Sequence, residues 1–148
     1  MSYISAYFHC VFATKDRQPL IRPELQERLW PYLGGIARQN GMVAMEIGGV
    51  ADHVHMLLAM SSTISLAKAM QFVKGGSAKW VHEVFAEHWR FGWQVKYGAF
   101  SVSFSQLEKT RTYIQTQAEH HRKMTFQEEF IALLRKHRVP YDERYLWE

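Results

Sequence analysis

The sequence predicts an α+β domain built on a ferredoxin-like or RRM-like antiparallel sheet. Segments with strand and helix periodicity follow one another in the order strand, helix, strand, strand, helix, strand, which is the split βαβ pattern. A short Ala-Asp connection joins the second and third strand segments, as in a hairpin. Helical segments follow the last strand, so we expect helices on one face of the sheet plus a C-terminal helix that carries Tyr113.

The first half of the chain contains a strand, a helix and the hairpin. Aromatic and β-branched residues alternate over residues 3–13, which predicts the first strand. Pro23 suits the first turn of a helix, and Gly41 supplies a stop signal. Between them apolar residues recur at helical spacing, at Leu25, Leu29, Leu33 and Ile36. The strand-like runs 42–50 and 53–60 form the expected hairpin.

The second half continues with a helix, a strand and further helices. A helix is expected from Ser65, because one stripe of it carries residues suited to a core. The members of this stripe are Leu66, Met70, Val73, Ser77 and Trp80. Residues 93–103 read as the fourth strand, residues 105–121 as a third helix and residues 125–136 as a short fourth one. No linker or internal repeat is visible, so we expect one domain over residues 1–148.

Composition limits the classes of protein that the chain can belong to. Its 148 residues are 47% hydrophobic, which suffices for one packed domain. Charges or histidines interrupt the apolar runs well before the roughly 20 residues that span a bilayer, so we expect a cytoplasmic protein without a membrane partner. The lone Cys10 cannot form an internal disulfide and suits a core position. The net charge of +4 favours a polyanionic partner.

Two histidines interrupt a run that otherwise suits a buried strand. His53 and His55 are two residues apart, so a strand presents both imidazoles on the same face. That geometry can hold a divalent cation. The alternative is that both are polar residues on a half-exposed strand.

The expected third helix supplies partners for such a cation. Tyr113 and Gln117 are four residues apart and share one helix face. A glutamine carbonyl is a plausible ligand for a hard cation, and a tyrosine one turn away could reach a phosphate held by that ion. A tyrosine hydroxyl is a weak nucleophile, which a metal that polarises the phosphate would assist. We expect Mg²⁺, for which Mn²⁺ can substitute; in the alternative, Tyr113 packs on the core and Gln117 is solvated.

Four stretches in this order resemble a known family: DHVHMLL (52–58), KGGSAKW (74–80), WQVKYGAFSVS (93–103) and YIQTQAEHHRKMTFQEEF (113–130). They are similar to the single-tyrosine transposases of small bacterial insertion sequences, including the palindrome-associated relatives, which are His-hydrophobe-His endonucleases. The resemblance covers nearly the whole chain. Lys96 stands where the family tends to have glycine, which concerns local DNA contacts and not the catalytic residues.

The resemblance implies a role for each matching residue. His53 and His55 correspond to the metal-binding pair, Gln117 to the third metal ligand and Tyr113 to the nucleophile that becomes joined to a DNA 5′-phosphate. It also implies a homodimer that cuts and rejoins single-stranded DNA at hairpins near the element ends. Because the covalent link keeps the bond energy, no nucleotide cofactor such as ATP is expected.

The helix after Ser65 also predicts a DNA-binding surface. Lys68, Gly75 and Lys79 lie on the side opposite its apolar stripe, with Lys74 in the same segment. Adjacent glycines are costly in a helix, and close approach of a nucleic-acid backbone or of another helix would explain them. Further candidates for phosphate contacts are Lys15, Arg17, Arg122 and Lys123. Taken singly, each of these four residues is more typical of an ordinary surface charge.

Other readings stay open from sequence alone. The chain could be a non-catalytic single-strand-binding domain in which Tyr7, Phe8 and Phe12 stack on bases. It could be a metal-dependent hydrolase that uses activated water, or a domesticated nickase acting on palindromic repeats. His9 could lie near the metal or be a hydrogen-bonded structural histidine, and His120 and His121 could support the site or lie on the helix surface.

Overall fold

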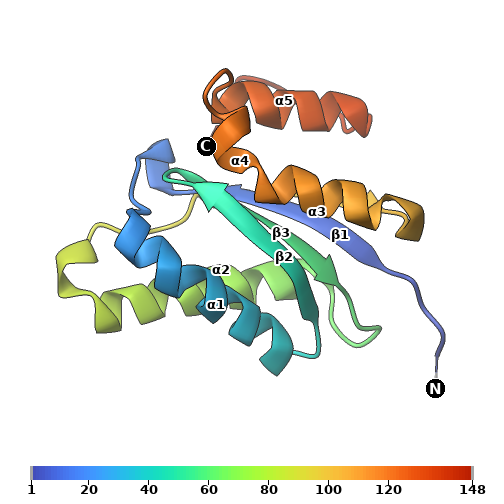
Figure 1. Cartoon of the computed structure of the whole chain (residues 1–148), viewed down its shortest axis with the longest axis horizontal. Coiled ribbons are helices and arrows are strands. Elements are labelled where there is room, and N and C mark those ends of the chain that lie inside the picture. Colours follow the sequence, from blue (N-terminus) through green and yellow to red (C-terminus); the bar gives the residue numbers. More distant parts are fainter. Residues whose placement is uncertain (1, 148) are drawn as a thin grey trace.

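The computed structural model describes residues 2–147, which form a four-stranded antiparallel sheet with helices on both faces (Figure 1). The strands lie in the order β2-β3-β1-β4 and are β1 (Tyr7–Ala13), β2 (Val43–Val50), β3 (His53–Ala59) and β4 (Gly98–Val102). Between them run α1 (Pro23–Gln39) and α2 (Leu66–Val84). After β4 come α3 (Leu107–Gln115), α4 (Gln117–His120) and α5 (Phe126–Lys136). The expected α+β class and the strand and helix order are confirmed.

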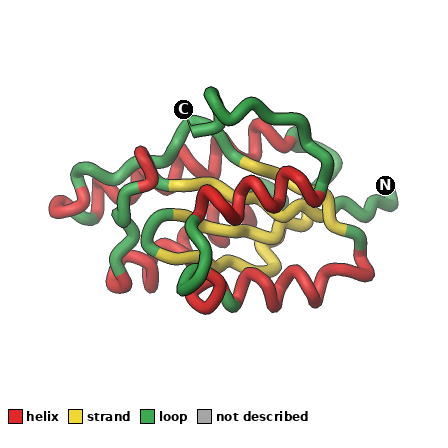
Figure 2. The backbone as a smooth tube through the Cα atoms, turned by 90° about the horizontal axis from the view of Figure 1, so that it is seen from above, coloured by secondary structure: helices red, strands yellow, loops and turns green. Residues whose placement is uncertain are grey.

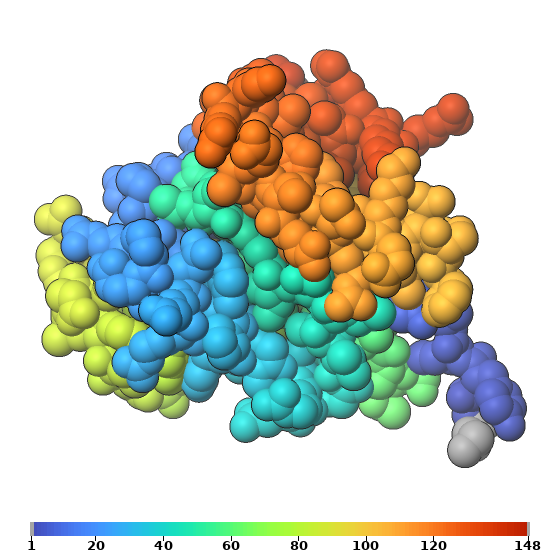
Figure 3. Space-filling view, viewed as in Figure 1, coloured from blue at the N-terminus to red at the C-terminus, as the bar shows by residue number. Residues whose placement is uncertain are grey.

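Two layers of helix enclose the sheet. α1 and α2 lie on one face, and α3, α4 and α5 lie on the other (Figure 1). Seen from above, helical segments overlie the strands (Figure 2). In the space-filling view the orange and red C-terminal segments cover the upper side of the molecule (Figure 3). The helices that the sequence predicted after the fourth strand, over residues 105–121 and 125–136, thus form a second layer on the sheet.

Alternation along the central strand explains why both layers form. On β3, Val54, Met56 and Leu58 belong to the core beneath α1 and α2. His53, His55 and Leu57 alternate with them and so face the C-terminal helices. All six residues are buried, because β3 pairs with strands on both sides and is covered on both faces.

Cys10 lies in the same core as Val54, as the sequence predicted for a cysteine that has no partner for a disulfide. Its thiol is fully buried, and burial raises its pKa to about 12. Within residues 2–147, no helix has the length and apolar character needed to cross a bilayer.

Three predicted boundaries differ from the structure. β1 begins at Tyr7 and not at residue 3, because Tyr7 pairs with Ala59, the last residue of β3. β4 begins at Gly98 and not at residue 93, since the preceding segment curves away and its carbonyls accept hydrogen bonds from Lys74. The helix expected over residues 105–121 is divided, because Thr116 between α3 and α4 departs from helical geometry (φ −105°, ψ 28°).

Candidate active site

The structure brings the two histidines of β3 under the C-terminal helices. Both side chains are completely buried, at 0% relative exposure. His53 Nε2 lies 3.1 Å from Gln117 Oε1, so the predicted amide reaches the predicted imidazole from α4. The alternative of histidines on a half-exposed strand, and of a solvated Gln117, is therefore wrong for this chain.

Glu129 joins this cluster from α5, and the sequence analysis missed it. Its Oε1 lies 3.0 Å from His55 Nε2, 3.3 Å from His53 Nε2 and 3.0 Å from His121 Nε2. Its Oε2 accepts a hydrogen bond from the Tyr113 hydroxyl. The carboxylate is 1% exposed, so a buried anion connects the metal-type ligands to the expected nucleophile.

One signal in the sequence could have revealed Glu129. Phe126, Phe130 and Leu133 recur at helical spacing over residues 125–136, and all three are buried. Position 129 is three residues after Phe126 and four before Leu133, so it shares that face. A carboxylate on a buried apolar stripe needs a partner of opposite charge.

The donor set fits a divalent cation. His53, His55 and Glu129 each offer one ligand atom, and these atoms lie within 4.8 Å of one another. Two imidazoles and a carboxylate suit several divalent transition metals, and the carboxylate and amide oxygens suit Mg²⁺ or Mn²⁺.

A second set of contacts orients the two imidazoles. His53 Nδ1 lies 2.7 Å from Asp52 Oδ1, and His55 Nδ1 lies 2.7 Å from His9 Nε2. In both rings Nδ1 is engaged, which directs Nε2 toward Glu129. Such outer partners typically fix the tautomer and orientation of metal-binding histidines. His9, buried on β1, is therefore a positioning residue for His55.

Burial and hydrogen bonds move the pKa values of these groups in opposite directions. Burial alone would lower the pKa of His53, but hydrogen bonds to Asp52 and Glu129 outweigh it and raise the pKa to about 9. Burial dominates at His55 and lowers its pKa despite Glu129. Burial, with the nearby charge of His55, lowers the pKa of His9 to about 3. For Glu129, burial is outweighed by hydrogen bonds to His53 and His55, which hold its pKa far below the usual range.

Tyr113 is half-buried above the histidines. Its ring lies 5.8 Å from the rings of both His9 and His55, centroid to centroid. Burial raises the pKa of its phenol, and the anionic Glu129 raises it further. The free phenol is therefore neutral, and a cation near the phosphate is needed to make its attack favourable.

The two histidines after Tyr113 differ in their surroundings. His121 contacts Glu129, and its Nδ1 lies 2.8 Å from the Met124 carbonyl oxygen. His120 lies at the edge of the site, with its Nε2 3.0 Å from Thr116 Oγ1. His121 therefore belongs to the buried cluster, while His120 packs over the Tyr113 ring at 4.7 Å.

The predicted DNA contacts lie in three places. Arg122 and Lys123 are exposed after α4 and line a surface hollow beside Asp52 and His121. Lys15 and Arg17 lie in the turn after β1, where Arg17 stacks on Trp147. The remaining candidates, Lys68, Lys74, Gly75 and Lys79, lie on α2, on the opposite face of the sheet from α3–α5 (Figure 1).

The two glycines of α2 have different surroundings. A Cβ at Gly75 would meet no atom within 4 Å, so Gly75 stays open to an approaching partner. A Cβ at Gly76 would lie 3.2 Å from Ile36 of α1, so this glycine serves helix packing. Lys74 donates to three backbone carbonyls and thus has a role inside the chain.

The aromatic residues proposed to stack on bases are not free to do so. Phe12 is 1% exposed and belongs to the core beneath α1 and α2. Phe8 packs against the same core, and Tyr7 packs against a cluster that includes Tyr113. Because helices cover both faces of the sheet, base stacking of the RNA-recognition type is not supported.

Comparison with known proteins agrees with this geometry. Residues 2–117 match the family described as "Transposase IS200 like". The ISDra2 transposase TnpA of Deinococcus radiodurans is 25% identical over 115 residues, which cover 74% of this chain and 82% of that protein. The transposase for insertion sequence element IS200 of Salmonella typhimurium is 29% identical over 80 residues, 54% of this chain and 53% of that protein.

Solved structures of transposases share the fold of this chain. A candidate transposase from Deinococcus radiodurans superposes with a TM-score of 0.65 and 27% identity, covering 79% of this chain and 95% of that one. A REP-associated tyrosine transposase bound to a REP hairpin shares the fold, with a TM-score of 0.61 and 11% identity, over 82% of this chain and 72% of that one. The family match ends at Gln117, so Glu129 lies beyond the matched residues.

Proposed function

Because the chain belongs to the family of IS200-like transposases, we propose that it cuts and rejoins single-stranded DNA through a 5′-phosphotyrosine link with the help of a divalent metal ion. One observation carries this proposal. The Tyr113 hydroxyl and the ligand atoms of His53 and His55 meet on the same buried carboxylate, that of Glu129. Because the nucleophile and the metal ligands contact the same carboxylate, they lie close enough together to act on one phosphate.

His53, His55 and Glu129 would hold the ion, with Gln117 beside them. When bound, Mg²⁺ or Mn²⁺ would polarise the scissile phosphate and offset negative charge in the transition state. Other residues of the chain would orient these ligands and the nucleophile. Asp52 and His9 orient the two imidazoles, and Glu129 Oε2 orients the phenol through its hydrogen bond.

The proposed chemistry conserves the phosphodiester. Tyr113 Oη forms a bond to phosphorus, the bond from phosphorus to the 3′ oxygen breaks, and that oxygen leaves as a 3′-hydroxyl. In rejoining, a 3′-hydroxyl attacks the phosphotyrosine and Tyr113 is released. Since one ester replaces another, no nucleotide cofactor is needed.

The partner and setting follow from the same family. We propose hairpin-marked single-stranded DNA as substrate, in line with a structural neighbour that is bound to a REP hairpin. We further propose a cytoplasmic homodimer with a ferredoxin-like sheet, whose DNA contacts include the basic residues of α2 and those at positions 15, 17, 122 and 123.

A covalent adduct tests the proposal directly. The intact protein would be mixed with Mg²⁺ and labelled single-stranded DNA from the flanks of its gene, where hairpins would mark an element end or a palindromic repeat. We expect a denaturant-resistant adduct with the unaltered protein and with Tyr145→Phe, whose tyrosine lies on the exposed tail. The adduct should vanish in Tyr113→Phe.

Other results would point to other functions. An adduct undiminished in Tyr113→Phe would refute the nucleophile. Cleavage without any adduct, surviving in Tyr113→Phe, would indicate attack by water. Binding that ignores EDTA and yields no product would indicate a non-catalytic binding domain.

A further inference from the structure

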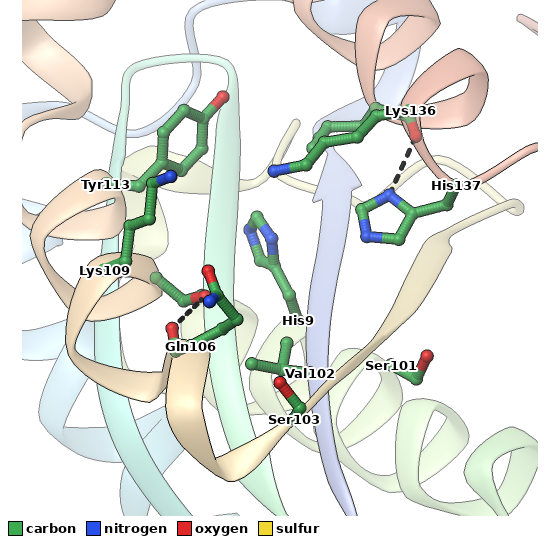
Figure 4. A pocket seen from close by; sticks show the side chains of 11 residues that line it. His9, Ser101, Val102, Ser103, Gln106, Lys109, Tyr113, Lys136 and His137 are labelled. Atoms are coloured by element: carbon green, nitrogen blue, oxygen red, sulfur yellow. Dashed lines mark hydrogen bonds between the residues drawn. The ribbon is translucent and has the colours of Figure 1, made fainter.

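A cavity of about 520 Å³ lies beside the ring of Tyr113 (Figure 4). Its walls come from β1, β4, α3 and α5. Tyr113 and His9 line it, and both also contact the buried cluster. The cavity therefore shares a wall with the candidate active site. Its volume falls in the ~300–1,000 Å³ range that is usual for small-molecule sites.

Two lysine side chains make this cavity suitable for an anion. Lys109 of α3 and Lys136 of α5 extend from opposite walls toward the space between them (Figure 4). Neither ammonium takes part in the ion pairs found among residues 2–147. The lining residues that the structure describes include no carboxylate. Two unpaired cations facing one space suit a phosphate group.

The rest of the lining suits a nucleobase. Tyr113 and His137 present aromatic rings, on which a base can stack. Ser103, Gln106 and Thr110 supply hydroxyl and amide groups for hydrogen bonds to base edges. One wall also carries aliphatic surface from Val102 and Leu133. A planar, polar ring joined to a phosphate has this combination of properties.

We propose that this cavity binds one unpaired nucleotide of the DNA strand that Tyr113 attacks. The inference rests on the proposed function and adds a subsite to it. With the base in the cavity and its phosphate between Lys109 and Lys136, the neighbouring phosphate of the same strand lies toward Tyr113. The cavity thereby positions the scissile phosphate and contributes to the choice of the cleavage site.

The first test measures nucleotide binding without any cleavage. The intact protein in EDTA would be titrated with each deoxynucleoside 5′-monophosphate and followed by amide NMR shifts. We expect saturable shifts at residues around the cavity, such as Ser103 and Thr110. Replacing both lysines (Lys109→Met with Lys136→Met) keeps their apolar stems and should weaken binding about tenfold, since hydrogen bonds to charged groups are lost. Arg38→Ala removes an exposed charge at the far end of α1 and should leave binding within about twofold.

The second test asks whether the bound nucleotide stands for part of a strand. The dissociation constant of a labelled single-stranded oligothymidylate would be measured in EDTA, with and without saturating mononucleotide. We expect saturating mononucleotide to raise the dissociation constant of the oligothymidylate several-fold with the unaltered protein and to leave it unchanged with the double lysine variant. Inorganic phosphate at equal concentration should compete less than the mononucleotide.

Each opposite result would overturn the proposal at a different point. The absence of saturable shifts at millimolar nucleotide would eliminate the subsite. Nucleotide binding without competition would mean that the cavity takes a free nucleotide. Equal competition by phosphate would reduce it to an anion site. Because neither test needs metal or cleavage, failure of Tyr113 to form an adduct would contradict the proposed function and leave these results interpretable.

Discussion

At Glu129, three imidazole nitrogens approach one carboxylate oxygen within 3.3 Å, and a phenol donates to the other oxygen. A buried carboxylate in this position stays ionised because the surrounding donors stabilise its charge. It is the anionic member of a ligand set that otherwise consists of imidazoles and an amide. A hard cation depends strongly on that charge.

Replacing this charge by an isosteric amide should therefore weaken metal binding. We expect Glu129→Gln to lower Mn²⁺ affinity by about tenfold or more, measured by calorimetry or by the Mn²⁺ electron paramagnetic resonance signal. Glu128→Gln is the matched control, because Glu128 is exposed on the same helix and only closes the capping box with Thr125. Equal affinities in the two variants would remove Glu129 from the metal site.

The lowered pKa of Glu129 also predicts a dependence of stability on pH. A carboxyl group whose pKa is lower in the folded than in the unfolded state adds stability above its ordinary pKa of 4.5, and this stability is lost as the pH falls toward the folded value. In metal-free protein, the stability difference between the unaltered chain and Glu129→Gln should be largest above pH 4.5 and should narrow below it. Urea unfolding across acidic pH measures this, and a difference that grows on acidification would contradict it.

The sequence predicted those site residues whose relation is local. His53 and His55 share a face because strands alternate, and Tyr113 and Gln117 share one because helices turn in 3.6 residues. Glu129 is separated from Gln117 by a turn and the start of another helix, so its approach depends on how α5 packs. Local periodicity contains no information on that distance.

At the scale of elements, the close contact between β2 and α3 positions the tyrosine. Gly48 of β2 faces Ile114, the neighbour of Tyr113, and a Cβ on Gly48 would lie 2.4 Å from the Ile114 carbonyl oxygen. Because the obstacle is backbone, a side chain at 48 would have to displace the helix. Glycine at this position lets α3 lie low enough for Tyr113 to reach Glu129.

Gly48→Ala should therefore loosen both the fold and the site. We expect a loss of about 1–3 kcal/mol in the free energy of unfolding, as for other overpacked positions, together with reduced adduct formation. Gly75→Ala is the matched comparison for stability, because its Cβ would meet open space within α2. That change should stabilise the protein by up to ~1 kcal/mol. Equal effects of the two substitutions in chemical denaturation would contradict the packing argument.

One side chain from α2 contacts three carbonyls of the segment before β4. Lys74 Nζ donates to the carbonyls of Gln94, Val95 and Lys96, at 2.5, 2.9 and 3.3 Å. Alternation over residues 93–97 predicted a strand, but these carbonyls are occupied by a distant lysine. For the elements from β1 to α2, helix and strand periodicity was sufficient to predict the secondary structure, because the local pattern and the tertiary packing agree there.

Lys74→Met should leave those three carbonyls without their donor. We expect a loss of ~1–3 kcal/mol in stability and faster amide hydrogen exchange over residues 94–97. Lys79→Met, on the same helix, removes a side chain that is 77% exposed and should change stability by less than ~0.5 kcal/mol. Unchanged exchange in Lys74→Met would show that the segment is held by other contacts.

At the scale of the whole molecule, separate apolar clusters stabilise the two sides of one sheet. The largest lies under α1 and α2, and another joins β1 and β4 to α5. The apolar stripe of α5 is buried in its own chain: Phe126, Phe130, Leu133 and Leu134 are 5 to 8% exposed. This stripe is therefore used within the chain, and a homodimer would need another surface.

In the single chain, the tyrosine and the histidines of the candidate site come from the same polypeptide. Tyr113 donates to Glu129 of its own chain, and Glu129 contacts His53 and His55 of that chain. The candidate site is thus built from one polypeptide. If a dimer exchanged α3 and α4 between subunits, each site would combine the histidines of one chain with the tyrosine of the other.

Mixing two inactive variants distinguishes these arrangements. Tyr113→Phe would be co-expressed with a chain that carries His53→Ala and His55→Ala, each with its own tag, and the mixed species isolated by both tags. When every site forms within one chain, no site in the mixture holds both the tyrosine and the histidines, so we expect no covalent adduct. Exchange would rebuild one complete site in each mixed dimer and restore roughly half of the activity of the unaltered dimer, because one of two sites would be intact. Restored adduct would mean that the contact between Tyr113 and Glu129 forms across subunits in the working enzyme.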